Sequence, residues 1–207
     1  MKATGLLLAC LLSLCCTAQT MTTVFGTMPK NMTLLVDSTL RQDLIDLSRE
    51  EMPKSIKDKL GGKVTLIRFD ENFMKLEFGN SSLQIALLDL VNDSKIVCMI
   101  QTVCAPVCDS RLSFYTSDWK PLETSDFIQL AAMSCFIDDT DNNDADFINA
   151  AKALDMDLMQ YDFDPEKLTL AQTYTTPLYL NKEDKEKIEP FLKQEPKVFE
   201  WNKFGFK

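Results

Sequence analysis

Between residues 64 and 115, five short segments alternate apolar with polar residues, and this pattern constrains the fold more than any other feature of the chain. Met74, Leu76 and Phe78, for example, are separated by Lys75 and Glu77. A period of two residues is typical of a β-strand with one buried face. The segments are residues 64–69, 73–78, 82–90, 95–103 and 108–115. Because the links between them are short, neighbouring strands are expected to be antiparallel, which predicts a meander of about five strands.

Helical patterns flank this meander on both sides. Upstream, Asp37 is placed to cap a helix that ends at Pro53, and a shorter helix is predicted over residues 55–60, ending at Gly61 and Gly62. Downstream, we expect a helix over residues 145–154, a hairpin over 156–174, a helix over 181–192 and a strand near 198–201. The predicted class is α+β: N-terminal helices packed on an antiparallel meander sheet of about five strands, with a mixed C-terminal extension.

The first 18 residues are typical of a signal peptide. Lys2 is followed by an apolar run over residues 6–14, and Cys16-Thr17-Ala18 offers the small residues that signal peptidase accepts. The run is shorter than the roughly 20 apolar residues that span a membrane as a helix. We therefore expect residues 1–18 to be removed near Ala18 and residues 19–207 to form a single exported domain, in the periplasm or outside the cell, with no transmembrane segment.

A lipoprotein is the alternative interpretation of the same segment, because Cys10, Cys15 and Cys16 all lie within it. The apolar run before Cys10 is too short for lipid attachment. Cys15 follows Leu14 and Cys16 follows another cysteine, and neither neighbour is the small residue that lipoprotein processing requires. Cleavage without a lipid is therefore favoured, with Gln19 as the mature N-terminus.

The charge of the chain argues against nucleic acid as a partner. The whole chain has a formal net charge of −9, and without Lys2 it has 21 basic against 31 acidic residues. Residues 121–170 alone contain 12 acidic residues and two lysines. An acidic surface repels phosphate backbones and anionic membranes. The expected partner is therefore a protein or a glycan.

Four cysteines follow the signal peptide, and an even number in an oxidising compartment suggests disulfides. Cys104 and Cys108 flank a three-residue link between two predicted strands, which brings them face to face and predicts a bond between them. Cys98 and Cys104 lie too far apart on one strand to pair. Two arrangements remain open: Cys104–Cys108 with Cys98–Cys135, or Cys98–Cys108 with Cys104–Cys135.

Histidine is absent from the chain, and this excludes most of the common catalytic sites. Ser-His-Asp and Cys-His nucleophilic systems cannot form, nor can any histidine-ligated metal site. The glycine-rich motifs GxGxxG and GxxxxGK[ST], which hold nucleotide phosphates, are also missing. No catalytic residue and no cofactor is therefore predicted. A pair of carboxylates that hydrolyses a glycosidic bond remains the one enzymatic alternative.

The acidic segment contains one weak candidate for a cation site. Asp139, Asp141 and Asn143 occupy the first, third and fifth positions of a calcium-loop pattern. The sixth position is Asp144 instead of glycine, and the twelfth is Ala150 instead of glutamate, so the segment is not an EF-hand. A solvated acidic loop is the favoured interpretation, and no metal is predicted.

Several short motifs resemble those of an uncharacterised family. They are Phe25-Gly26-Thr27-Met28-Pro29, Leu60-Gly61-Gly62, Cys104-Ala105-Pro106-Val107-Cys108, Phe114-Tyr115, Trp119, Thr176-Pro177-Leu178-Tyr179-Leu180, Glu183-Asp184 and Trp201. The family consists of secreted proteins of unknown function from gut-type Gram-negative anaerobes. The resemblance implies a bacterial source and export, and it carries over no activity and no catalytic residues.

The expected function is that of an exported, non-enzymatic envelope or extracellular protein that binds a protein or a glycan. The alternative is a carboxylate-based hydrolase acting on polysaccharide. A pocket with aromatic walls and two carboxylates about 5 to 9.5 Å apart favours the hydrolase. An apolar patch or an exposed sheet edge favours the binding protein.

Overall fold

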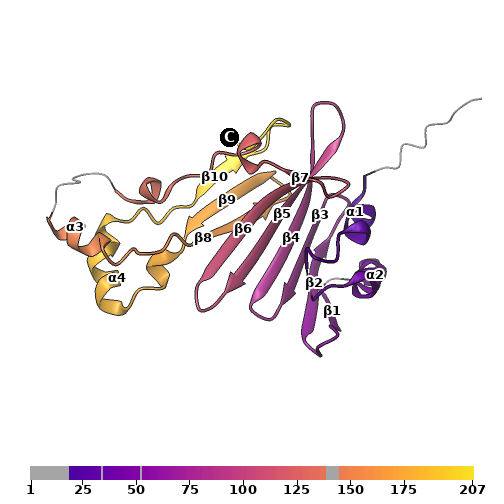
Figure 1. Cartoon of the computed structure of the whole chain (residues 1–207), viewed down its shortest axis with the longest axis horizontal. Helices are drawn as coiled ribbons and strands as arrows, with labels where there is room; N and C mark the ends of the chain where they lie inside the picture. Colours follow the sequence, from indigo (N-terminus) through magenta and orange to yellow (C-terminus); the bar gives the residue numbers. More distant parts are fainter. Residues whose placement is uncertain (1–18, 34, 52, 139–144) are drawn as a thin grey trace, which may run out of the picture.

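A seven-stranded antiparallel sheet forms the centre of the computed structural model, which describes residues 19–33, 35–51, 53–138 and 145–207 (Figure 1). Its strands follow one another in chain order. They are β1 (Lys54–Lys57), β2 (Lys63–Phe69), β3 (Phe73–Phe78), β4 (Ser81–Asp89), β5 (Lys95–Cys104), β6 (Cys108–Thr116) and β7 (Pro121–Leu122). The α+β class is as predicted. Strands β2 to β6 are the five predicted segments, but the prediction of about five strands is wrong, because β1 and β7 extend the sheet at its two edges.

Strand β1 replaces the short helix predicted over residues 55–60. It pairs with β2 from Lys54↔Leu66 to Lys57↔Lys63. Gly61 has a φ of 82°, and the side chain of Asp58 accepts hydrogen bonds from the N–H groups of Leu60 and Gly62. The glycine pair therefore closes a hairpin turn instead of ending a helix.

Two helices cover one face of the sheet. The first, α1 (Met21–Thr27), was not predicted from the sequence. The second, α2 (Ser38–Leu47), begins where it was predicted, because the Asp37 side chain accepts the N–H of Leu40 at 2.9 Å. Together the helices bury aliphatic and methionine side chains, among them Met21 and Leu44, against Leu66, Leu76 and Ile85.

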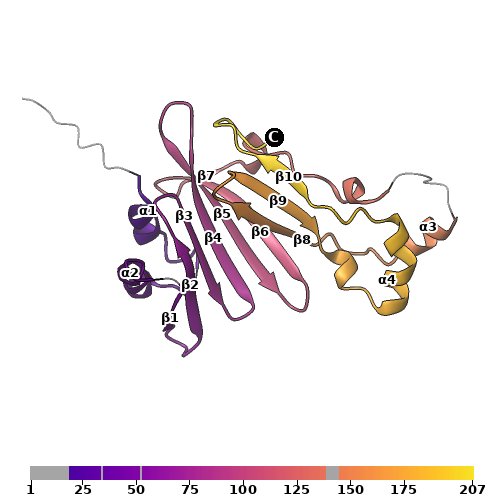
Figure 2. The ribbon, with the colours of Figure 1, turned by 180° about the vertical axis from the view of Figure 1, so that it is seen from behind.

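A second, three-stranded sheet covers the opposite face (Figure 2). Its strands lie in the order β10 (Lys197–Glu200), β9 (Thr169–Tyr174) and β8 (Met159–Asp164). The core between the two sheets is rich in aromatic rings, including Phe73, Phe114, Phe163 and Trp201. Both faces of the large sheet are therefore buried, whereas the alternating sequence pattern indicated one.

Side chains of the large sheet bond to the outer edge of β8. The N–H groups of Met159, Tyr161 and Phe163 donate to Asp109 Oδ1, Ser110 Oγ and Gln84 Oε1, respectively, each at 3.1 Å. These residues alternate along β8, so their N–H groups all point away from β9. The bonds therefore pair N–H groups at the edge of β8 that would otherwise be available to another strand.

A helical lobe projects beyond the large sheet, at the end opposite to α1 and α2 (Figure 1). It contains α3 (Ala145–Ala151), η3 (Thr176–Leu178), α4 (Lys182–Ile188) and η4 (Glu189–Phe191), close to the predicted helices. Phe147 of α3 contacts Phe191 of η4 with ring centroids 5.4 Å apart. Two further short 3-10 helices, η1 (Thr124–Asp126) and η2 (Met133–Phe136), precede the lobe. No helix within the described ranges is long and apolar enough to cross a membrane.

Candidate functional site

The disulfide predicted between Cys104 and Cys108 is present at the tip of the β5–β6 hairpin. The two residues are opposite each other in the strand register, and their Cα atoms are 3.9 Å apart. Cys98 and Cys135 have free thiols, so neither open alternative for these two cysteines is formed. Cys98 is buried between the two sheets, whereas Cys135 is exposed in η2. Burial raises the pKa of the Cys98 thiol, which keeps it protonated and unreactive.

The weak cation candidate, Asp139, Asp141 and Asn143, lies outside the described residues. Within the ranges that the structure does describe, no group of three or more His, Cys, Asp or Glu side chains could hold a metal ion. A pocket and the main-chain groups beside it form the candidate site instead.

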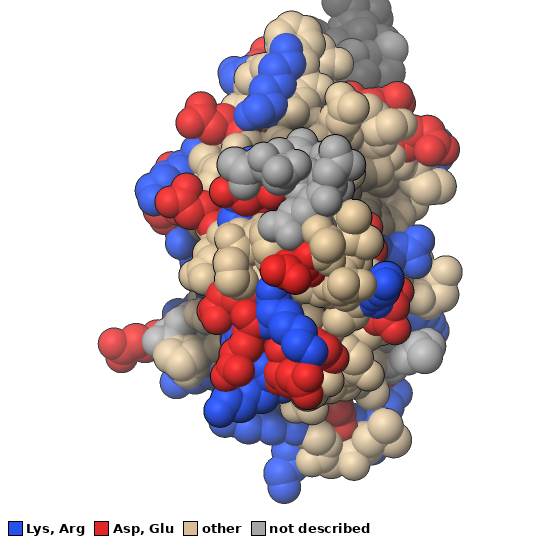
Figure 3. Space-filling model, turned by 90° about the vertical axis from the view of Figure 1, so that its left-hand side faces the viewer, with Lys and Arg blue, Asp and Glu red and all other residues tan. Residues whose placement is uncertain are grey.

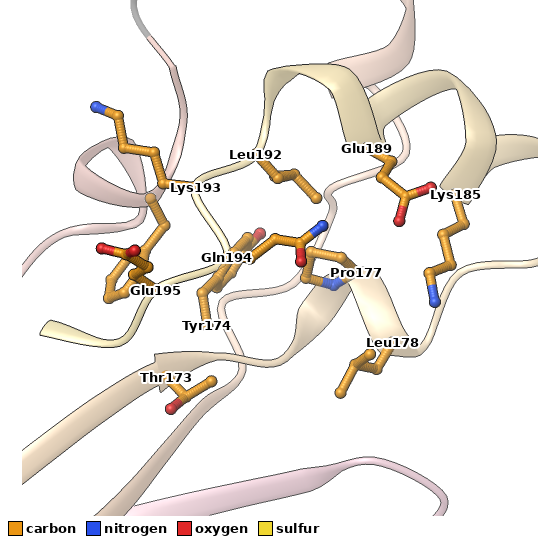
Figure 4. Close-up of a pocket in the computed structure, with 11 residues that line it drawn as sticks. Thr173, Tyr174, Pro177, Leu178, Lys185, Glu189, Leu192, Lys193, Gln194 and Glu195 are labelled. Carbon is orange, nitrogen blue, oxygen red and sulfur yellow. The ribbon is translucent and has the colours of Figure 1, made fainter.

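A pocket of about 270 Å³ lies between the end of β9 and the helical lobe, and we call it the α4 pocket (Figure 4). Its apolar floor and walls come from elements far apart in sequence: Phe136 from η2, Tyr174 from β9, Pro177 from η3 and Leu192 from the segment after η4. The rings of Phe136 and Tyr174 stack with centroids 5.9 Å apart. The pocket can therefore bury an apolar group.

Charged side chains surround this apolar floor. Lys185 and Glu189 lie at one end of the pocket, and Lys193 and Glu195 lie at the other (Figure 4). Gln194 extends between them over the floor. Two positive and two negative groups leave the rim with no net charge, so the pocket does not select for a charged ligand.

The pairing of β9 with β10 stops where the pocket begins. The last pair is Gln172↔Lys197, although β9 continues to Tyr174. Pro196 precedes β10, and the chain before it turns away from β9 toward the lobe. This divergence opens the gap between Tyr174 and Glu195, both of which line the pocket.

The strand register directs the main chain of Tyr174 into that gap. On the β8 side, the N–H of Thr175 donates to the carbonyl of Leu158 at 2.9 Å. Successive residues of an antiparallel strand bond to opposite sides, so the N–H and C=O of Tyr174 point to the side of β10. No residue in the described ranges forms a main-chain or side-chain hydrogen bond to these two groups there. The α4 pocket thus combines an apolar floor with one unpaired strand position.

The pocket does not have the arrangement that glycoside hydrolysis needs. Glu189 and Glu195 are both exposed and lie at opposite ends of the rim (Figure 4). A general acid in such an enzyme sits in a desolvated site that raises its pKa. Burial does raise the pKa of Tyr174, which keeps the phenol neutral. The arrangement is therefore suited to binding.

A second hollow, of about 440 Å³, lies beside the disulfide and we call it the hairpin groove. Val103, Val107, Leu158 and Tyr179 are among its lining residues, and Tyr179 follows Leu178, which lines the α4 pocket. The hydroxyl of Thr175 donates to the carbonyl of Cys108 at 2.7 Å. This bond joins the disulfide hairpin to the residue that follows β9.

The lobe end of the molecule is mixed in charge, not uniformly acidic. Figure 3 shows Lys and Arg side chains interspersed with Asp and Glu on this end. Helix α4 contributes to this pattern through the ion pairs Lys187–Glu183, at 2.7 Å, and Lys182–Glu186, at 3.8 Å. The acidic character of residues 121–170 is therefore offset locally by lysines that follow later in the chain.

The sequence profile of one family matches nearly the whole chain. The family is described as a protein of unknown function, DUF3256, and the match covers residues 13–206. The chain belongs to this family. The resemblance expected from the short motifs is thus confirmed in its general form, an uncharacterised family. No curated protein matches the chain significantly.

A solved structure supports the fold of this DUF3256 member. It is a domain of an uncharacterized protein from Porphyromonas gingivalis W83, with 29% sequence identity and a TM-score of 0.80. The similarity covers 89% of this chain and 96% of the other. Both sheets and the lobe lie within a chain of which nine-tenths is matched, so the architecture is shared with this relative.

The α4 pocket of this DUF3256 member was not predicted from the sequence. Its residues lie between positions 136 and 195, and they come together only when the second sheet folds onto the first. One local signal was available: Pro196, directly before a predicted strand, marks the place where pairing to a neighbour begins.

Proposed function

We propose that this protein is an exported, non-enzymatic binding protein that holds a macromolecular partner in the α4 pocket. The single observation that carries the proposal is the pocket itself, in which an apolar floor lies beside an unpaired main-chain position. Leu178 extends the apolar surface outward, since 61% of its surface is exposed. Exposed apolar groups next to a concave site are typical of interaction surfaces.

Hydrolysis of polysaccharide is the less favoured function. The chain has no histidine, and the two carboxylates of the pocket are exposed at its opposite ends. A binding site needs neither a raised pKa nor a fixed carboxylate separation. The observed pocket therefore supports binding with the residues that it has.

The proposed site can be tested with two matched variants. Leu178→Lys places a charge at the pocket, and Val198→Lys makes the same change on β10, where 56% of the residue is exposed. Panels of peptides and oligosaccharides are screened by calorimetry against the wild-type protein. We expect ligands whose affinity falls roughly tenfold or more in Leu178→Lys and stays unchanged in Val198→Lys.

Two results would overturn this proposal. One is that every ligand found binds both variants as well as it binds the wild-type protein. The other is the release of reducing ends from a polysaccharide by the wild-type protein and its loss in Glu189→Gln, which would establish the hydrolase.

Export is part of the same proposal and has its own test. The small residues before Gln19 predict that the exported form begins at that position. Mass spectrometry of protein recovered from the periplasm or the medium measures the N-terminus directly. A lipid-modified cysteine at the N-terminus would instead make the protein a lipoprotein.

A further inference from the structure

We propose that the partner in the α4 pocket is an extended polypeptide segment, which pairs its main chain with Tyr174 and places one apolar side chain on the pocket floor. This inference rests on the proposed function, because it names the occupant of the same pocket.

The first reason is the main chain of β9. Tyr174 directs an N–H and a C=O toward the gap, beyond the last pair of the β9–β10 ladder. An extended segment presents a donor and an acceptor at the matching spacing, as in other cases of strand addition. A polypeptide therefore satisfies both groups of Tyr174 with one residue, in the position that Glu195 would take if β10 continued.

The second reason is the match between the pocket and an apolar side chain. Residues directly opposite each other in paired strands point their side chains to the same face of the sheet. The residue paired with Tyr174 can therefore place its side chain beside the Tyr174 ring, on the floor that includes Phe136. The rim carries two lysines and two glutamates, and Lys185 with Glu189 faces Lys193 with Glu195 (Figure 4). A charged side chain in the pocket would be attracted by one pair of rim charges and repelled by the other pair. An uncharged side chain avoids this repulsion.

A saccharide is less suited to the same pocket. Sugar rings are commonly held against an open aromatic face, but Phe136 is 1% exposed and Tyr174 is 9% exposed. The two rings stack on each other instead of facing the solvent. They form a floor for an apolar side chain and do not offer a platform for a pyranose.

The apolar surface continues past the pocket in the direction of the hairpin groove. Leu178 and Tyr179 are both exposed at the end of η3. Leu178 lines the pocket and Tyr179 lines the groove. An extended segment that leaves the pocket over η3 would therefore place further apolar residues on these two side chains.

The test uses the whole protein and peptides selected from a random-peptide library displayed on phage. Each enriched peptide is synthesised with one backbone N-methyl group at successive positions, and its affinity is measured by fluorescence polarisation. We expect one position at which N-methylation weakens binding roughly tenfold or more, because it removes the N–H that pairs with Tyr174. Amide hydrogen exchange of Tyr174, followed by NMR, should slow roughly tenfold or more in the saturated complex.

Leu178→Lys and Val198→Lys serve again as the pocket variant and the matched control. Peptide binding that is weakened by Leu178→Lys, with protection of the Tyr174 amide, supports the inference. Peptides that bind the pocket without protecting Tyr174 overturn main-chain pairing. If oligosaccharides bind in a Leu178-dependent way and no peptide does, the polypeptide inference fails while the proposed binding function stands. If neither class of ligand depends on Leu178, both fail.

Discussion

Helices bury one face of the seven-stranded sheet, and a second sheet buries the other. The helix side is mainly aliphatic and rich in methionine, with Met21, Met28 and Met74 fully buried, although Phe25 and Trp119 are buried there too. The other side is aromatic, with Phe114 in ring contact with both Phe127 and Phe206. The first layer comes from residues that directly precede the sheet in sequence. The second layer comes from residues that follow the sheet, as far along the chain as Phe206. Flexible methionine side chains can fill the space between the sheet and helices that lie nearby in sequence. A layer that comes from distant residues needs complementary side-chain shapes and specific hydrogen bonds to pack in a single orientation.

The largest expected effect tests whether the two faces form one cooperative unit. Phe114→Ala removes a buried ring from the aromatic core and should lower the free energy of unfolding by about 3–5 kcal/mol. Leu44→Ala does the same on the helix face, by about 2–5 kcal/mol. Urea titrations followed by circular dichroism should show a single transition in both variants. Two transitions in Phe114→Ala alone would mean that the second sheet unfolds separately.

The next largest effect concerns the polar contacts that distinguish the two faces. Gln84 accepts the N–H of Phe163 and donates to Asp162, so Gln84→Ala leaves a buried N–H without its partner. We expect a loss of about 1–3 kcal/mol. The matched control is Gln101→Ala, where a half-buried amide bonds to the Met32 carbonyl on the helix face. Equal losses in urea titrations of the two variants would contradict the contrast between the faces.

The disulfide at the tip of the β5–β6 hairpin should have a more modest effect. It closes a loop with a sequence separation of only four residues. A small loop removes little entropy from the unfolded chain, so Cys104→Ala with Cys108→Ala should cost about 2 kcal/mol or less. Non-reducing peptide mapping of the exported protein should show Cys104 joined to Cys108. A peptide linking Cys104 to Cys135 would contradict the structure.

The smallest expected effect is a fall in the free energy of unfolding at acidic pH, to which one carboxyl group in each layer should contribute. The pKa of Asp37 is lowered, first by the N–H of Leu40 and then by Lys59. The pKa of Asp164, in the β8–β9 hairpin, is lowered first by the N–H of Lys167. A carboxyl whose pKa is lower in the folded state stabilises the fold above its unfolded pKa of about 3.9 and loses this contribution as the pH falls through the folded value.

The measurement is urea unfolding between about pH 7 and pH 3. Asp37→Asn and Asp164→Asn should each flatten the acid part of the stability profile. Asn can still accept the capping bonds, so stability near neutral pH should change little. An unchanged acid profile in both variants would show that neither carboxyl contributes.

The same contrast explains how much could be predicted from the sequence. Strands β2 to β6 were predicted to within one or two residues, since alternation and short links are local signals. The capping by Asp37 and the Cys104–Cys108 bond are local as well. The helix predicted over residues 55–60 was wrong because Gly61-Gly62 fits both a helix end and a hairpin, and only pairing with β2 decides between them.

The second layer and its pocket depend on contacts between residues far apart in sequence, and short sequence patterns do not predict such contacts. Gln84 lies between Leu83 and Ile85 in the sequence, an alternation that is typical of a strand with one solvated face. In the structure it is buried, because β8 supplies a hydrogen-bond partner from 79 positions away. The α4 pocket likewise lies where β9 continues beyond its last pair with β10, and its lining comes from several distant elements.

The three hydrogen bonds along the edge of β8 also limit where the chain can change in length. Met159, Tyr161 and Phe163 must meet acceptors on β6 and β4 at a fixed two-residue interval. A single residue inserted within β8 would turn the following N–H groups toward β9 and mismatch the whole hairpin. Extra residues in the turn that contains Pro165 would leave the interval intact. Natural length variation, peptide tags and labelling insertions should therefore be accepted in that turn and rejected within the strand.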